Sequence, residues 1–179
     1  MPLPLGHTAI GLATCETFQD TDHHHSRWAT FFFVALLANL PDMDMVLGLL
    51  FHGNGNLFHR GPTHSILFSL VAGYAASRLW RVWDQIPRLG FPLCFGLIFS
   101  HVLADMLFTA SPVSLLWPFQ LYLSPGFKGW GGVMHVVLFQ SVRDAGIVAG
   151  CFLYVVLLRS LRGAFNWLWV PATIRRRRK

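Results

Sequence analysis

Long apolar runs alternate with short polar stretches along this chain. The apolar runs cover residues 6–18, 28–51, 65–83, 91–110 and 145–158. A helix needs about 20 apolar residues to cross the hydrocarbon core of a bilayer, so the run at 6–18 is too short for an easy crossing. The pattern predicts an all-α fold: a polytopic membrane helical bundle with about four spanning helices plus short re-entrant or interfacial helices.

Prolines interrupt two of the apolar stretches. Pro41 disfavours helical geometry at Leu40, so we expect the helix over 28–51 to break and restart there. Three further prolines make a continuous helix over 106–127 unfavourable. We expect the second half of that stretch to be interfacial or re-entrant, and residues 129–142 to form a separate helix on or in the bilayer.

The composition agrees with a single membrane domain covering residues 1–179. Hydrophobic residues make up 54% of the chain, charged residues only 12%, and the mean hydropathy is +0.48. Soluble domains have about twice that share of charge. The three cysteines are isolated in apolar segments, which is typical of small buried hydrophobes rather than of disulfides or zinc knuckles.

The net charge of +6 does not by itself indicate a nucleic-acid partner, and we expect none. Five of the fourteen cations form the run at 175–179, and most others flank apolar runs. This distribution is typical of topology signals and of attraction to anionic headgroups. The positive-inside rule therefore predicts that the loop around 78–88 and the basic tail at 158–179 are cytoplasmic.

Two carboxylates lie at the break in the second apolar run. Asp42 and Asp44 are two of only eight acidic residues in the chain. A charge in a membrane segment is costly without a partner and is a functional-site hypothesis by default. An Asp can also cap a helix, which would explain one of the two. The predicted topology places both at the extracytoplasmic end, with His59, His64, His101 and Asp105 as candidate partners.

Imidazole and carboxylate groups together suggest a metal centre. His101 and Asp105 are four residues apart, so on a helix they share one face and could hold one ion or simply hydrogen-bond to each other. His59 and His64 bracket the end of a loop and could reach the same point. Such ligands favour zinc, manganese or iron over magnesium or calcium.

The same loop carries residues that could support such a site. Arg60 suits an anionic substrate group, because guanidinium binds phosphate through two hydrogen bonds, or it anchors a lipid headgroup. Thr63 and Ser65 are either donors to the ligand side chains or helix caps. Arg143 and Asp144 are expected to neutralise each other at a helix start. The run His23–His25 lies in a polar linker at the other predicted membrane face, where adventitious metal binding is the simpler interpretation.

Four blocks, taken in order, resemble a known family. They are Gly6-His7-x3-Gly11, Leu40-Pro41-Asp42-x-Asp44, His59-Arg60-Gly61-x-Thr63-His64-Ser65 and His101-x3-Asp105. Over residues 5 to 120 the chain resembles the LexA-regulated, inner-membrane metal-dependent hydrolase family of bacteria. The resemblance implies a multi-pass inner-membrane location. It also implies a ligand set of His7, Asp42, Asp44, His59, His64, His101 and Asp105. A short polar stretch after Asp105 and the His23–His25 run depart from the family pattern, and neither affects the motif positions.

We therefore expect a metal-dependent hydrolase with one or two divalent ions, zinc first and manganese second. Metal-activated water would cleave an ester or phosphoester of an amphiphilic, phospholipid-like substrate. Asp42 or Asp44 would act as general base, and Arg60 would stabilise negative charge in the transition state. The alternative is a small metal-ion or proton transporter that uses the same side chains. In a third hypothesis these polar residues only lock the helices together.

Overall fold

The computed structural model describes residues 3–18, 27–54, 60–108, 112–119 and 130–169; in the last range, side chains are described for Val142 and residues 144–163. The elements of these ranges are helical. They are α1 (Pro4–Phe18), α2 (Arg27–Ala38), η1 (Leu40–Asp42), α3 (Met43–His52), η2 (Pro62–His64), α4 (Ile66–Ala76), η3 (Leu79–Arg81), α5 (Phe91–Phe108) and α6 (Trp130–Trp169). The predicted all-α membrane bundle is confirmed.

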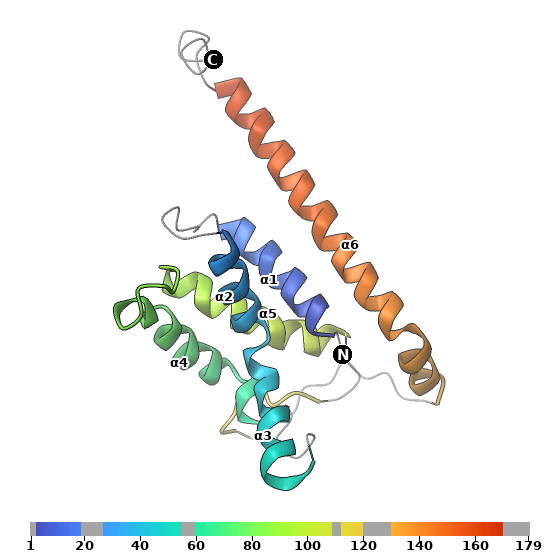
Figure 1. Cartoon of the computed structure of the whole chain (residues 1–179). Helices are drawn as coiled ribbons and strands as arrows, with labels where there is room; N and C mark the ends of the chain where they lie inside the picture. The colour runs from blue at the N-terminus through green and yellow to red at the C-terminus, as the bar shows by residue number, and fades with distance from the viewer. Residues whose placement is uncertain (1–2, 19–26, 55–59, 109–111, 120–129, 170–179) are drawn as a thin grey trace.

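Helix α5 lies at the centre of the bundle and contacts α1, α2 and α4. Figure 1 shows α3 projecting at one end of the bundle, while α6 runs beside α1 and extends past it. The apolar core forms where α2 faces α5 and includes the fully buried Val34, Leu97 and Ile98. The faces of α2 and α5 that meet are apolar, so the core holds α5, which carries His101 and Asp105, against the helix that leads into the turn with Asp42.

Small residues bring the helices close together. A Cβ added at Gly73 of α4 would lie 2.9 Å from the backbone N and Cα of Phe95 on α5. At Gly11 of α1, it would lie 2.7 Å from the Cβ of Ala38 at the end of α2. Glycine and alanine allow this approach because they have little or no side chain, as at many helix contacts in membranes.

The expected break at Pro41 is confirmed. Pro41 lies in the 3-10 turn η1, and the axes of the helical segments Arg27–Ala38 and Leu40–His52 differ by 57°. Proline lacks the N–H that a continuous helix would use, so the chain tightens into this turn and starts again as α3. The bend turns α3 away from the bundle (Figure 1).

Two described helices are long and apolar enough to cross a membrane, α5 and the Asp144–Gly163 part of α6. The bent pair Arg27–Ala38 and Leu40–His52 makes a third if it counts as one span. The expected span at 65–83 is shorter than predicted, because α4 has 11 residues and is therefore roughly 16 Å long. The 3-10 turn η3 follows α4, and Arg78 and Arg81 lie at this turn.

The C-terminal part of the chain differs from the prediction. We expected separate helices at 129–142 and 145–158, but α6 is one helix of 40 residues. No proline interrupts it, so its backbone hydrogen bonds continue through Arg143 and Asp144. The prediction that a helix starts at these two residues is therefore wrong. The side chain of Arg143 lies outside the described residues, and Asp144 accepts hydrogen bonds from the N–H groups of Leu3 and Gly6.

Candidate metal centre

The break between α2 and α3 positions two carboxylates. Asp42 lies at the N-cap position of α3, yet its side chain makes no capping hydrogen bond to that helix. Asp44 lies in the first turn of α3 and is buried. Capping therefore does not account for Asp42, and its carboxylate faces the interior histidines instead.

The turn before α4 positions His64. Ser65 is the N-cap of α4, where its hydroxyl accepts a hydrogen bond from the N–H of Phe68. The same hydroxyl donates to the carbonyl of Pro62, which fixes the 3-10 turn η2. Because both ends of η2 are held, the imidazole of His64 points into the bundle and is fully buried. Of the two roles expected for Ser65, the structure shows the helix cap.

Helices α5 and α1 supply the remaining groups. His101 and Asp105 lie one turn apart on the buried face of α5. The ring of His7 on α1 stacks on the ring of His101, with centroids 3.7 Å apart and planes inclined by 17°. The Nε2 atom of His7 lies 3.5 Å from Oδ1 of Asp105. Asp105 thus faces residues from another helix as well as its neighbour on α5.

Four of these side chains surround one point. Asp42, His64, His101 and Asp105 each offer one ligand atom, and these atoms all lie within 4.8 Å of one another. Asp42 Oδ1 is 3.3 Å from Nε2 of His101 and 3.6 Å from Nε2 of His64. His64 Nε2 is 3.6 Å from Oδ2 of Asp105. Ligands at about 2.1 Å from a tetrahedral zinc ion are about 3.4 Å from each other, so these three separations fit such an ion.

Several buried polar atoms at the site have no hydrogen-bond partner among the described residues. Within the described ranges, Nε2 of His101, both carboxylate oxygens of Asp105 and both ring nitrogens of His7 are buried and make no hydrogen bond. Leaving one buried polar atom unsatisfied costs about 1–3 kcal/mol, and more for a charged group. A divalent cation would satisfy the atoms of His101 and Asp105 together, so the residues present fit a metal ion.

Hydrogen bonds behind the two histidines orient their rings. Nδ1 of His101 lies 2.7 Å from the carbonyl oxygen of Ala38, which can only accept, so Nδ1 carries the proton. That tautomer leaves the lone pair of Nε2 directed toward Asp42. Metal-binding histidines are commonly held in this way by a carbonyl or carboxylate on the far side of the ring.

Thr63 and Asp44 hold His64 from behind. The Thr63 hydroxyl donates to Oδ2 of Asp44 over 2.6 Å, and its oxygen lies 3.1 Å from Nδ1 of His64. Asp44 Oδ2 is itself 3.4 Å from that nitrogen. Thr63 therefore takes the donor role expected for it. The structure places Asp44 beside the outer nitrogen of His64 and not among the four converging ligand atoms.

The carboxylates also control the charge of His64. Burial lowers the pKa of this imidazole, but hydrogen bonding to Asp42 and Asp44 outweighs burial and raises the pKa to about 9 in the metal-free protein. An arriving cation must displace that proton, because only the deprotonated nitrogen can act as a ligand. Metal binding at this site is therefore coupled to proton release.

Arg60 lies at the edge of the cluster. Its Nε is 3.6 Å from Oδ2 of Asp105, and its side chain is 13% exposed. The backbone of Arg60 adopts φ +64°, a left-handed conformation that is uncommon outside glycine. Its carbonyl accepts a hydrogen bond from the N–H of Ser114, which holds the turn in place. The guanidinium is thus directed at the site rather than at open solvent.

The structure brings together six of the seven residues that the family resemblance implied, in two layers. Asp42, His64, His101 and Asp105 converge, whereas His7 lies against Asp105 and Asp44 lies behind His64. His59 and the His23–His25 run lie outside the described residues. The carbonyl of Ala38 could not be found from the sequence, because a backbone atom leaves no residue signature.

Comparison with known proteins identifies a bacterial inner-membrane family. The model of the YdjM inner membrane protein family matches residues 1–173. The chain is 26% identical over 143 residues to the inner membrane protein YbcI of Escherichia coli (strain K12). The aligned region covers 78% of this chain and 76% of that protein. No solved structure matches. On the strength of the family match over almost its whole length, the chain belongs to the YdjM inner membrane protein family.

Proposed function

We propose that this protein is a metal-dependent hydrolase of the bacterial inner membrane that cleaves an ester or phosphoester of an anionic amphiphile. The observation that carries the proposal is the convergence of Asp42, His64, His101 and Asp105 on one buried point. Imidazole and carboxylate ligands suit zinc, with manganese as the second choice. Groups of this kind are used by catalytic metal sites in hydrolases.

The residues around this point would have different roles in the reaction. A bound divalent ion would supply Lewis acidity and lower the pKa of water in the site. Asp42 is the most open of the site carboxylates, with its side chain 16% exposed, while those of Asp44 and Asp105 are 3% and 0% exposed. A carboxylate that faces the histidines with one oxygen has a second oxygen that can take a proton from attacking water. In this proposal His64, His101 and Asp105 would hold the ion and leave one position for water, as in catalytic zinc sites. Asp42 is the general base, and Asp44 orients His64.

Arg60 would bind the anionic part of the substrate. Its guanidinium lies beside Asp105 at the edge of the cluster and is partly exposed. Guanidinium donates two parallel hydrogen bonds to phosphate or carboxylate, and its charge stabilises negative charge that develops during cleavage. An anionic group held there would lie next to the converging ligands.

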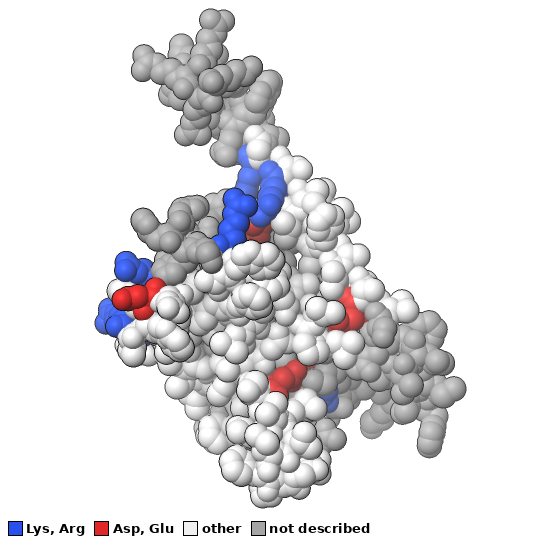
Figure 2. Space-filling model, viewed as in Figure 1, with Lys and Arg blue, Asp and Glu red and all other residues white. Residues whose placement is uncertain are grey.

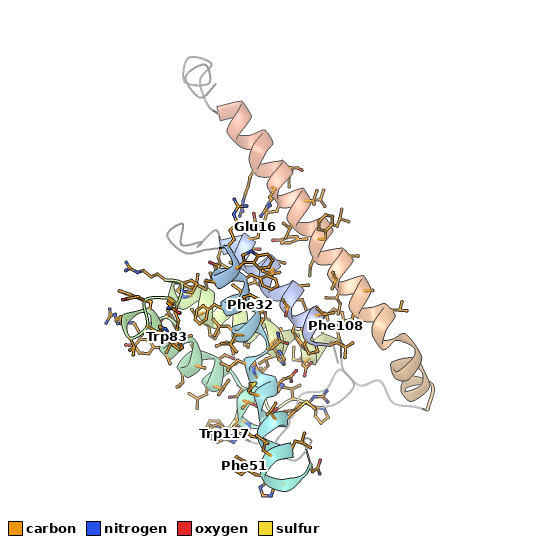
Figure 3. The ribbon with its side chains drawn as sticks, viewed as in Figure 1. Glu16, Phe32, Phe51, Trp83, Phe108 and Trp117 are labelled. Atoms are coloured by element: carbon orange, nitrogen blue, oxygen red, sulfur yellow. The ribbon has the colours of Figure 1, made fainter. Side chains whose placement is uncertain are left out.

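The surface beside the site is apolar, which favours an amphiphilic substrate. Along α3, which begins directly after Asp42, large hydrophobic side chains are exposed: Met43, Val46, Leu47, Leu49, Leu50 and Phe51. Figure 2 shows Asp or Glu side-chain atoms at the surface where α2 meets α3, directly above the apolar surface of α3. In Figure 3, Phe51 and Trp117 project at the same end of the molecule. Acyl chains would lie along such a surface while the headgroup reaches the site.

The distribution of charge supports a site on the outer side of the membrane. Figure 2 shows most of the visible Lys and Arg side chains at the ends of the molecule away from α3. Basic ends face the cytoplasm under the positive-inside rule, so the C-terminus would be cytoplasmic and the site extracytoplasmic. A reporter fused after Lys179 that is active only outside the cytoplasm would contradict this topology. Regulation by LexA, implied by the family resemblance, stays a prediction.

Metal analysis and lipid hydrolysis together test the proposal. Detergent-purified protein should contain stoichiometric zinc or manganese and should release product from a panel of phospholipids and lipid-linked phosphoesters. The double variant Asp42→Asn, His64→Ala should lose both properties. The matched control, Asp84→Asn with His52→Ala, replaces the same residue types at exposed positions and should keep both. A wild type without metal would refute the proposal, and so would a double variant that keeps full metal content.

The bend at the site supports transport as the second candidate function. Broken helices line the ion pathways of many transporters, and the α2–α3 pair is such a break with two carboxylates at it. Ion flux into liposomes without turnover of any lipid would favour transport. Lipid turnover without flux would favour the hydrolase. A chain whose site variants lose only stability would support the purely structural hypothesis.

A further inference from the structure

Helix α6 supplies the N-terminal cap of α1. The first turn of a helix has N–H groups without partners inside the helix. Leu3, which directly precedes α1, has no side-chain oxygen that could accept from them. Instead Asp144, from the other end of the chain, accepts hydrogen bonds from the N–H of Leu3 over 2.8 Å and of Gly6 over 3.1 Å. The residue is 5% exposed, so this is a buried contact between α6 and α1.

The opposite end of α1 is held by the same helix. Arg159 donates two hydrogen bonds to the carboxylate of Glu16, at 2.9 and 2.8 Å. Arg162 donates to the backbone carbonyls of Glu16 and Thr17, at 2.9 and 3.0 Å. Figure 3 shows Glu16 at the end of α1 where α6 passes. An acid therefore meets the positive end of the α1 dipole and two arginines meet its negative end, so α6 fixes the position of α1 along its axis.

His7 directly follows the residue that Asp144 holds. Neither ring nitrogen of His7 makes a hydrogen bond within the described part of the chain. Its stacking on His101 and its approach to Asp105 thus depend on where the backbone of α1 lies. The hydrogen bond from Gly6 to Asp144 holds the backbone one residue before the ring, and Asn39 donates a hydrogen bond to the Thr8 hydroxyl one residue after it.

We propose that Asp144 is a positioning residue for the metal centre, and that it acts through His7. It touches neither the ligand cluster nor a substrate, and its effect passes through the first turn of α1 to the imidazole that faces Asp105. This inference rests on the proposed metal-dependent function, because the consequence of moving His7 is a weaker hold on the ion. Helix α6, the last helix in the described part of the chain, thereby becomes part of a site whose other residues all lie before residue 106.

A double-mutant cycle on zinc affinity tests the inference. Asp144→Asn keeps the size of the side chain but loses its charge, and should weaken zinc binding by about tenfold, within the range seen when groups that support metal ligands are removed. In a His7→Ala background the same substitution should have no further effect, since its route to the site is gone. Equal losses in both backgrounds would overturn the role through His7. Arg159→Gln is the control, because it loosens the far end of α1 and should leave zinc affinity within twofold.

Hydrogen exchange provides a readout that needs no metal. In metal-free protein, Asp144→Asn and the harsher Asp144→Ala should speed amide exchange in the first turn of α1, whereas Arg159→Gln should not. Unchanged exchange there would overturn the inference even if zinc binding is intact. A wild type that binds no zinc would refute the proposed function and the role toward an ion, while exchange would still show whether Asp144 holds α1.

Discussion

Replacing Thr63 by valine would remove one hydroxyl and leave the shape of the side chain nearly unchanged. That hydroxyl donates to Asp44 over 2.6 Å and lies 3.1 Å from Nδ1 of His64. A hydrogen bond to a charged group is worth about 1.5–3 kcal/mol. If that energy orients His64 for the ion, zinc affinity should fall roughly 10- to 100-fold, which agrees with the usual cost of losing a group behind a metal ligand.

The assay is a competition titration with a chromophoric chelator, carried out on detergent-purified protein at one fixed pH. Thr63→Ser keeps the hydroxyl and serves as the matched control, with affinity close to wild type. Thermal unfolding of the metal-free variants shows whether the fold is intact. A folded Thr63→Val protein with zinc affinity within twofold of wild type would refute the view that Thr63 and Asp44 hold His64 for metal binding.

Three other predictions concern packing, protons and substrate. Gly73→Ala should destabilise the protein by about 1–3 kcal/mol, because the new methyl group would meet the backbone of Phe95 at 2.9 Å; a melting curve measures this, and Gly146→Ala, where a Cβ meets nothing within 4 Å, should change little. Zinc affinity should rise by about tenfold per pH unit up to a pH near 9, since below the pKa of about 9 a proton occupies His64; a flat titration between pH 6 and 8 would contradict this. Arg60→Gln should lower turnover of an anionic lipid by about 10²-fold, which is typical of losing one group that stabilises developing charge. The zinc content of this variant should be unchanged. Equal turnover by the variant and the wild type would show that Arg60 has no role in the mechanism.

The sequence predicts those features of the fold that depend on local chemistry. The break at Pro41 follows from a missing N–H, and the shared buried face of His101 and Asp105 follows from the spacing of a helix. Both appear in the structure. The role of Ser65 as a cap was one of two alternatives, and only the position of Phe68 in space decides between them.

Features that depend on distant partners could not be predicted in the same way. Asp144 looks like half of a neutralised pair in the sequence, because its neighbour is an arginine. The structure gives it further partners at the other end of the chain, the N–H groups of Leu3 and Gly6, and backbone groups have no side-chain signature. The length of α4 was also overestimated, since apolar composition continues beyond Ala76 while the helix ends there.

The four converging side chains come from segments that are far apart in the sequence: the α2–α3 junction, η2 and α5. A cation held among them would act as a cross-link that closes two long loops of the chain. Such a link restricts the unfolded chain and adds its binding energy to the stability of the native protein. Chelation should then lower the stability of the bundle in addition to abolishing the proposed hydrolysis, and a cell short of the metal would accumulate a more protease-sensitive form of this protein.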